Sequence, residues 1–224
     1  MITFKNVTKR FPLGNVALKN VSFQINENEF VFLVGPSGAG KSTIINLILR
    51  KFKQTEGEIK VDDFVLDKKF SKVDSLRKKI GVIFQDFKLI LSKNVEENIA
   101  LSLKILGFNK ERAREETEKV LEFVGLSRKR YMFPLQLSAG EQQRVAIARA
   151  IAGGRSIVLA DEPTGNLDPV TSWKIMEIFS KLKGKRTIIF ATHNTDIVNS
   201  FTARVIRLKE GEIIEDSKKG KYKL

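Results

Sequence analysis

The chain has 224 residues, enough for one large domain or a core with a subdomain, and its 42% of hydrophobic residues argues against disorder. It has no cysteine, which excludes disulfides, thiolate metal sites and thiol nucleophiles and suits a cytosolic protein. The N-terminal segment lacks the apolar core of a signal peptide, and no later run approaches the roughly 18 apolar residues that a membrane span needs. We therefore expect neither a secretion signal nor a membrane span.

The formal net charge of +14 makes nucleic acid and an anionic membrane surface the partners to consider. The basic residues form no single arm, and no aromatic residues alternate with them to stack on bases. We therefore favour a solvated surface beside a negatively charged neighbour over a nucleic-acid groove. The basic clusters lie at 50–53, 68–72, 76–79, 128–130 and 218–223.

Two alternating segments, 2–11 and 16–25, open the chain. The turn between them contains Pro12, Gly14 and Asn15, which predicts a β-hairpin. At its edge, Phe11 is a candidate to stack on a nucleobase without reading its identity, and core packing is the rival interpretation of this ring.

Residues 35–42 read GPSGAGKS, a complete phosphate-binding loop between an apolar strand at 30–34 and a helix-like run at 42–49. In such a loop the backbone N–H groups surround the phosphates, Lys41 reaches the β and γ phosphates, and the Ser42 hydroxyl binds magnesium. The sequence therefore predicts a nucleoside triphosphate site. Its expected members are Gly35, Pro36, Ser37, Gly38, Ala39, Gly40, Lys41, Ser42 and Thr43.

Apolar runs recur along the chain, and each ends in a polar or glycine residue, namely Gly35, Gln85, Asp161 and His193. Continuous runs of this length predict strands buried on both faces, as in a parallel sheet flanked by helices. Because ligands bind at the carboxyl ends of such strands, we expect these endpoints to converge on one crevice.

The side chains at these endpoints predict hydrolysis. Asp161 is placed to support Mg²⁺, and Glu162, the next residue, faces an attacking water as general base. The amide oxygen of Gln85 is a further candidate ligand for magnesium or water. His193, the one histidine in the sequence, is expected to contact the γ-phosphate and to orient the water.

Residues 88–153 show helical spacing and predict a helical insertion. Within it, Val120, Leu121, Phe123 and Val124 form the expected apolar stripe of one helix. The tail predicts a second hairpin around Glu210 and Gly211, followed by a basic end that we expect to be frayed.

The segment LSAGEQQRVAIARAIAGG at 137–154 predicts a helix that begins with a capping box of Ser138 and Glu141 and ends at two glycines. Two small residues, Ala139 and Gly140, follow the cap. We interpret them as leaving the positive helix start open to an anion, which predicts a second phosphate contact.

Taken together, these segments resemble the ATP-binding cassette (ABC) ATPases. The matching motifs are GPSGAGKS as Walker A, Gln85 as Q-loop, LSAGE as signature, IVLADE as Walker B, 166–168 (NLD) as D-loop and His193 as switch. The signature departs from the common LSGGQ at Ala139 and Glu141, which we do not expect to abolish function.

The resemblance implies an α/β P-loop NTPase with a mixed sheet core, an N-terminal antiparallel β subdomain and a helical subdomain. It also implies one nucleotide-binding domain over 1–224, with 1–87 and 154–224 as the core and about 88–153 as the helical part. Its ligands would be ATP and Mg²⁺. A head-to-tail homodimer would place Ser138 and Gly140 of one copy over ATP held by the other.

Within the family, residues 83–101 and the N-terminal segment are similar to the cell-division branch. This implies an integral membrane partner resembling FtsX, a docking surface for it at 86–108, a role in the control of cell-wall hydrolases, and a peripheral location on the cytoplasmic side of the cell membrane, beside anionic lipid. The alternatives are a lipoprotein-release or export ATPase of the LolD or MacB type, an ABC ATPase that handles nucleic acid, and a nucleotide-gated scaffold without turnover.

Overall fold

The computed structural model describes residues 1–12, 14–218 and 220–222. The chain divides into two compact units, of which the first is Met1–Arg77 with Lys183–Leu224 and the second is Lys78–Leu182. The helical segment expected at 88–153 lies wholly within the second unit, which also contains strands of the α/β core.

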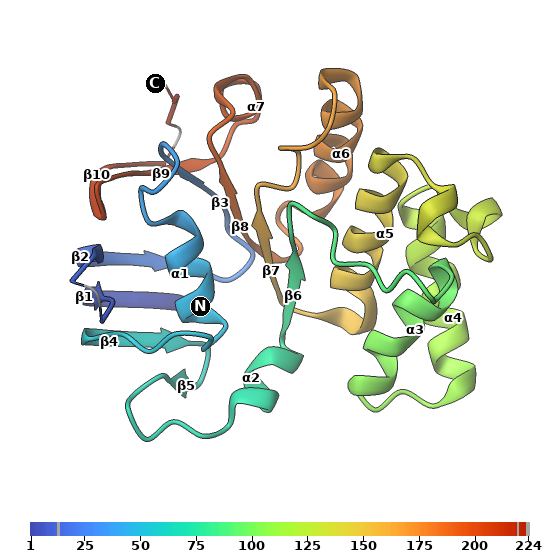
Figure 1. The fold of residues 1–224 in the computed structure, drawn as a ribbon, viewed down its shortest axis with the longest axis horizontal. Coiled ribbons are helices and arrows are strands. Elements are labelled where there is room, and N and C mark those ends of the chain that lie inside the picture. The colour runs from blue at the N-terminus through green and yellow to red at the C-terminus, as the bar shows by residue number, and fades with distance from the viewer. Residues whose placement is uncertain (13, 219, 223–224) are drawn as a thin grey trace. The chain divides into compact units, whose positions relative to one another are not determined.

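An antiparallel sheet forms the N-terminal part of the first unit, with strand order β2-β1-β4-β5. The predicted hairpin is present as β1 (Ile2–Arg10) and β2 (Val16–Ile25), and β4 (Glu56–Val61) and β5 (Phe64–Val65) extend it (Figure 1). The rings of Phe4 and Phe23 stack across the hairpin with centroids 4.5 Å apart. Alternating side chains therefore bury one face of this sheet.

The rest of the first unit carries parallel strands and the helices that follow them. β3 (Phe30–Val34) pairs in parallel with β8 (Thr187–Thr192) and with β9 (Arg204–Lys209), and β9 pairs antiparallel with β10 (Glu212–Ser217). Helix α1 (Lys41–Ile48) follows β3, and α7 (Thr195–Ser200) follows β8. Every residue of β3 and β8 is buried, which explains their unbroken apolar sequences. The predicted α/β class and the C-terminal hairpin are confirmed.

The expectation of a frayed basic end is wrong at Tyr222. Its side chain is buried, its backbone N–H donates to Oδ1 of Asn199 at 2.7 Å, and Nδ2 of Asn199 donates to its carbonyl at 2.9 Å. The sequence pattern misses this anchor because one aromatic residue stands among lysines. Lys219 and Lys223 of the predicted basic end lie outside the described residues.

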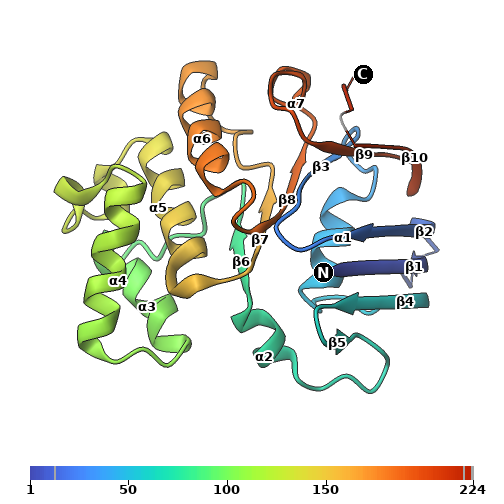
Figure 2. The ribbon, with the colours of Figure 1, turned by 180° about the vertical axis from the view of Figure 1, so that it is seen from behind.

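Helix α2 (Val73–Lys78) precedes the strands of the second unit, β6 (Ile80–Ile83) and β7 (Ile157–Asp161), which pair in parallel. Helices α3 (Val95–Ile105), α4 (Lys110–Phe123), α5 (Ala139–Ile151) and α6 (Pro169–Leu182) supply the rest (Figure 2). Short 3-10 helices occupy Ser127–Lys129, Pro134–Gln136 and Ala152–Gly154. Helix α5 lies so close to β6 that a Cβ atom on Gly81 would lie 2.0 Å from the carbonyl oxygen of Ala150.

Helices α3, α4 and α5 lie within 88–153, where the sequence predicts helices, and the buried stripe of α4 needs one correction. Val120, Leu121 and Val124 are buried as expected, but Phe123 is half-buried and the stripe continues through Ala113 and Thr117. Thr117 is tolerated in the stripe because its hydroxyl donates to the Ala113 carbonyl at 2.7 Å. In the described parts of the chain, no helix has both the length and the apolar character needed to cross a bilayer.

Candidate functional site

The predicted phosphate-binding loop links β3 to α1 in the first unit. Gly35 and Gly40 have φ values of 151° and 108°, which favour glycine. A Cβ on Gly35 would lie 2.3 Å from the Leu208 carbonyl oxygen, and one on Gly40 would lie 2.7 Å from Cδ2 of Leu18. Both glycines are therefore required by close packing, and the loop fits a cradle of backbone N–H groups for phosphate.

Lys41 is the first residue of α1 and its side chain is buried. Its Nζ donates to the carbonyl oxygens of Gly35 at 2.7 Å and Pro36 at 3.2 Å. The ammonium group thus lies against the phosphate-binding loop. Ser42 is exposed and Thr43 half-buried in the first turn of the same helix, while Ser37, Gly38 and Ala39 complete the loop.

His193 lies at the same edge as this loop. In the parallel pairing of β3 and β8, Val34 is opposite Thr192, so Gly35 and His193 each follow directly after paired residues. His193 is exposed, and the next residue, Asn194, caps α7 by accepting from the N–H groups of Asp196 and Ile197. The fold therefore brings together two of the four predicted strand endpoints within the first unit.

Phe11 follows β1 and is half-buried. Its ring meets that of Phe52 edge-on with centroids 5.3 Å apart, and Nζ of Lys9 lies 4.8 Å from its centroid. The packing interpretation of Phe11 thus has a partner in Phe52, and nucleobase stacking stays a prediction.

The other two endpoints lie together in the second unit. Ile83 is opposite Ala160 in the pairing of β6 and β7, so Gln85 and the pair Asp161–Glu162 leave the same edge. Asp161 is the last residue of β7, and Glu162 already turns away with a φ of 48°, a left-handed conformation. The backbone conformation therefore changes between the two residues that carry the carboxylates.

The signature segment folds as predicted at its start. Ser138 caps α5: Glu141 N–H donates to Oγ of Ser138 at 3.4 Å, and Ser138 N–H donates to Oε2 of Glu141 at 3.0 Å. Nζ of Lys129 lies 2.5 Å from Oε1 of Glu141, and this hydrogen bond, with the Ser138 N–H, holds the pKa of Glu141 below its usual value. Glu141 is therefore fixed as part of the cap.

The interpretation that Gly140 leaves the helix start open needs correction. Gly140 is buried, and a Cβ atom there would lie 2.3 Å from Cγ2 of Thr171 on α6. Packing between helices therefore already requires glycine at this position. Ser138 and Ala139 remain exposed.

Sequence reasoning gave no role to two amides beside Glu162. Nε2 of Gln143, a fully buried residue of α5, donates to the Pro163 carbonyl at 2.5 Å. Asn166 exchanges hydrogen bonds with Gln85, as described further below. The only signal in the sequence was the place of Asn166 in the NLD motif.

The oxygen-bearing residues predicted to bind magnesium are Ser42, Gln85 and Asp161. Hydroxyl, amide and carboxylate oxygens suit a hard cation such as Mg²⁺, which is typically held by few protein ligands together with substrate phosphates. No group of three or more His, Cys, Asp or Glu residues able to hold a metal occurs among the described residues. Ser42 belongs to the first unit and Gln85 and Asp161 to the second, and each of these side chains carries an oxygen of the kind that Mg²⁺ prefers.

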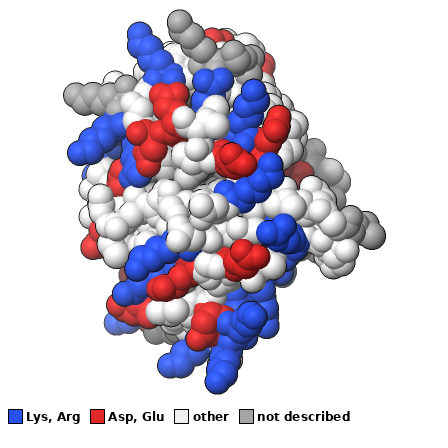
Figure 3. Space-filling model, turned by 90° about the vertical axis from the view of Figure 1, so that its left-hand side faces the viewer, with Lys and Arg blue, Asp and Glu red and all other residues white. Residues whose placement is uncertain are grey.

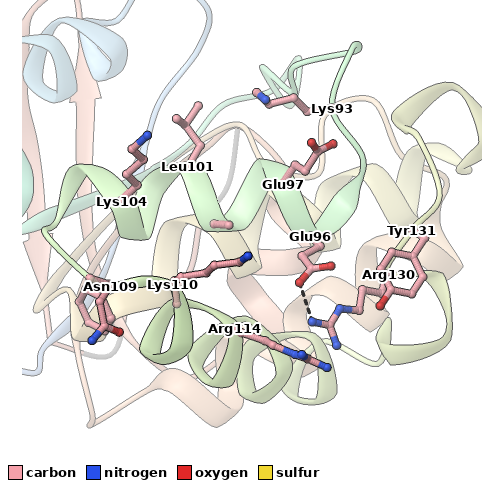
Figure 4. Close-up of a pocket in the computed structure, with 13 residues that line it drawn as sticks. Lys93, Glu96, Glu97, Leu101, Lys104, Asn109, Lys110, Arg114, Arg130 and Tyr131 are labelled. Atoms are coloured by element: carbon pink, nitrogen blue, oxygen red, sulfur yellow. Dashed lines mark hydrogen bonds and ion pairs between the residues drawn. The ribbon is translucent and has the colours of Figure 1, made fainter.

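A separate pocket of about 760 Å³ lies between α3 and α4 (Figure 4). Its lining includes the apolar Leu101, Phe108 and Ala113, the basic Lys93, Lys104, Lys110 and Arg114, and the acidic Glu96 and Glu97. Arg130 closes one side, where Nη2 donates to Oε1 of Glu96 at 2.5 Å. The pocket therefore suits a segment with an apolar side chain and an acidic group.

Charges on the face drawn in Figure 3 are mixed, with Asp and Glu side chains between those of Lys and Arg. A mixed pattern agrees with the expectation of a solvated surface on this face rather than a continuous basic groove.

Comparison with known proteins identifies the family. The ABC transporter family profile matches residues 18–165. The cell division ATP-binding protein FtsE of Bacillus subtilis is 45% identical over 224 residues, covering 99% of this chain and 98% of that protein. FtsE of Streptococcus pneumoniae strain D39 is 44% identical over 224 residues, with 99% and 97% covered.

Solved structures agree. A dimeric structure of MJ0796, an ABC transporter cassette of Methanocaldococcus jannaschii, has a TM-score of 0.86 and 40% identity, covering 99% of this chain and 100% of that one. A second dimeric structure of that cassette, in a post-hydrolysis state with ADP and Pi, has a TM-score of 0.85 and 38% identity, with the same coverage. The chain therefore belongs to the ABC transporter family, as one of its ATP-binding cassettes.

Proposed function

We propose that this chain is the ATP-hydrolysing subunit of a membrane ABC complex that acts in bacterial cell division with an integral membrane partner resembling FtsX. The observation that carries the proposal is the near-full-length similarity to two cell-division ATP-binding proteins, at 44% and 45% identity. The phosphate-binding loop and the carboxylate pair after β7 supply the chemistry. A lipoprotein-release or export complex would use the same catalytic residues with a different membrane partner.

The first unit binds the triphosphate. Backbone N–H groups of 35–43 donate to the phosphate oxygens, and Lys41, already oriented by the Gly35 and Pro36 carbonyls, offsets the charge of the β and γ phosphates. His193 orients the attacking water from the neighbouring strand end. Phe11 is proposed to contact the base.

The second unit carries out proton transfer. Water attacks the γ-phosphorus, Glu162 takes its proton, and ADP leaves as the bond to the β-phosphate oxygen breaks. Ser42, Asp161 and Gln85 would hold Mg²⁺, which supplies charge neutralisation at the β and γ phosphates. The change of backbone conformation after β7, between Asp161 and Glu162, supports separate tasks for the two residues.

A homodimer is the assembly in which the signature acts. The dimeric structure of MJ0796, which is 40% identical to this chain, supports a homodimer. In the proposed dimer, Ser138 and Gly140 of one copy contact ATP held by the other. The exposed Ser138 at the positive start of α5 is suited to an anionic group.

The membrane partner is proposed to dock a short cytoplasmic helix at 86–108. Leu91, Tyr131 and Leu135 are exposed on 56%, 68% and 79% of their area, so their apolar side chains are available to a partner. Seven of the thirteen residues that line the pocket between α3 and α4 belong to 86–108, and Tyr131 lines it from outside that range. The proposed location is therefore peripheral, on the cytoplasmic side of the cell membrane, and the net charge of +14 supports it because it suits anionic lipid.

The test uses Glu162→Gln, which removes the base and keeps the shape of the side chain. We expect hydrolysis to fall by on the order of 10² to 10⁴ and an ATP-bound dimer to accumulate. This variant is purified with ATP and magnesium from solubilised membranes of its host, and co-purifying proteins are identified by mass spectrometry. Lys41→Ala, treated identically, controls for nucleotide-independent capture.

An FtsX-like protein enriched with Glu162→Gln would support the proposed function. A lipoprotein-release or export permease would preserve the ATPase assignment and reject the division role. Nucleic acid without a membrane protein would reject both the partner and the location, and wild-type turnover by Glu162→Gln would reject Glu162 as the base.

A further inference from the structure

Gln85 and Asn166 are joined by two hydrogen bonds in opposite directions within the second unit. Nε2 of Gln85 donates to Oδ1 of Asn166 at 3.2 Å, and Nδ2 of Asn166 donates to the backbone carbonyl of Gln85 at 3.1 Å. The residues are 81 positions apart in the sequence. Such a reciprocal pair defines the position of both amides more tightly than a single bond would.

The pair also determines which atom of the Gln85 side-chain amide contacts Asn166. Nδ2 of Asn166 is used on the Gln85 carbonyl, so Oδ1 is the atom that Asn166 offers to the Gln85 side chain. An oxygen acceptor requires a donor, and the Gln85 amide has its donors on Nε2. The Gln85 amide is thereby oriented with Nε2 toward Asn166. Its other atom, Oε1, is left to bind a metal or to accept a hydrogen bond from water.

Asn166 lies on the short segment that begins with Glu162. Backbone bonds brace this segment: Gly165 N–H donates to the Glu162 carbonyl at 3.1 Å, and Leu167 N–H donates to the Thr164 carbonyl at 3.1 Å. Gln143 of α5 holds its Pro163 carbonyl. A shift of Asn166 is therefore transmitted to the backbone of Glu162 through few bonds.

Gln85 in turn begins a constrained turn. Phe87 and Lys88 both have left-handed backbones, with φ values of 59° and 48°, which cost free energy in residues other than glycine. Arg149 of α5 compensates by donating to the carbonyls of both residues, at 2.8 Å and 2.6 Å. The turn is fixed from one side by Arg149 and from the other by Asn166.

We infer that Asn166 is a positioning residue that orients the Gln85 amide and couples it to the segment carrying Glu162. The inference rests on the proposed function, because it assigns Gln85 to the magnesium and water site. It gives a physical route by which a change at residues 85–88 alters the placement of the base.

Gly165 supplies an independent observation. A Cβ atom on Gly165 would lie 3.0 Å from Nε2 of Gln85, tighter than most contacts of this kind. Gly165→Ala therefore presses on the same amide without removing a hydrogen-bonding group. Two unlike substitutions, Asn166→Ala and Gly165→Ala, should disturb the same function.

The experiment measures kcat, the KM for ATP and the magnesium concentration at half-maximal hydrolysis for the full chain, and, without turnover, the magnesium dependence of ATP binding in a Glu162→Gln background. We expect Asn166→Ala to lower kcat and to raise the magnesium requirement, each by about three- to tenfold, the factor that one lost hydrogen bond is worth. The KM for ATP should stay within about twofold, since Asn166 is not assigned to phosphate binding. Asn166→Asp retains the acceptor for Nε2 but loses the donor to the Gln85 carbonyl, so it should recover only part of the loss, and Gly165→Ala should resemble Asn166→Ala.

A double-substitution cycle separates positioning from a merely structural role. In a Gln85→Ala background, Asn166→Ala should cause a much smaller loss than in the wild type, because the amide it positions is gone and only its bond to the backbone carbonyl of residue 85 remains. Asn26→Ala, an exposed asparagine after β2, is the matched control and should leave activity unchanged.

This inference alone would be overturned if the double variant lost activity by the product of the two single losses. The same holds if Asn166→Ala had the activity and the magnesium requirement of the control. Wild-type behaviour of Gln85→Ala would remove the assigned role of Gln85 and the inference with it. Absence of magnesium-dependent hydrolysis in the wild-type chain would instead overturn the proposed function.

Discussion

Gly140 and Thr171 meet so closely that any side chain on Gly140 would collide with the threonine methyl group. The distance from an added Cβ to Cγ2 of Thr171 is 2.3 Å, whereas Cβ and Oγ1 of Thr171 are 3.6 and 3.8 Å away. The conflict is thus with a single methyl group. It joins the start of the signature helix α5 to the start of α6, the helix that follows the NLD motif.

This contact predicts a rescue. Gly140→Ala should lower the free energy of unfolding by about 1–3 kcal/mol, the usual cost of overpacking, and should reduce hydrolysis because the start of α5 shifts. Adding Thr171→Ser removes Cγ2 and keeps the hydroxyl, so the double variant should regain most of both losses. Urea unfolding and ATPase rates check this. A double variant no better than Gly140→Ala would show that Thr171 is not the obstacle.

The proposed dimer predicts complementation between two inactive chains. Ser138→Arg blocks the signature and Lys41→Ala disables the phosphate-binding loop, so each alone should be nearly inactive. When they are mixed in equal amounts, each mixed dimer has one site with both intact groups, and activity should return to about a quarter of the wild-type level. ATPase assays of the mixture and of each chain alone measure this. No recovery, with mixed dimers demonstrated by differently tagged chains, would contradict the composite site.

The Glu141–Lys129 ion pair predicts an acid dependence of stability. The pKa of Glu141 is lower in the folded chain than its usual 4.5, chiefly because Lys129 donates to it. The ionised form of Glu141 therefore stabilises the fold at pH values above its usual pKa. This contribution is lost as the pH falls through the lowered pKa of the folded chain. The thermal midpoint should fall less steeply with acid in Glu141→Gln than in the wild type.

The matched control for this pH series is Glu111→Gln, in the exposed first turn of α4, which should keep the wild-type slope. Equal slopes for the wild type and Glu141→Gln would show that the ion pair adds no acid dependence.

The sequence was sufficient where a local pattern has one structural solution. Buried strands such as 30–34 and 187–192, the cap at Ser138 and the loop at 35–42 were predicted because apolar periodicity, capping and glycine requirements act within a few residues. Contacts between segments that are distant in the sequence were not predicted. The need for glycine at 140 depends on Thr171, and the orientation of Gln85 depends on Asn166. Local sequence patterns around these residues do not predict either contact.

The buried end at Tyr222 gives the last prediction. Tyr222→Ala removes a ring that is 1% exposed and leaves space beside Arg207, whose guanidinium lies 5.5 Å from the ring centroid. The loss should be about 2–4 kcal/mol of unfolding free energy, as for other buried large-to-small changes. Tyr131→Ala is the matched control, since Tyr131 is 68% exposed, and it should leave the stability of the isolated chain unchanged. Thermal unfolding of both variants distinguishes the two sites. Equal midpoints would mean that the end of the chain is frayed after all, as its lysine-rich composition first indicates.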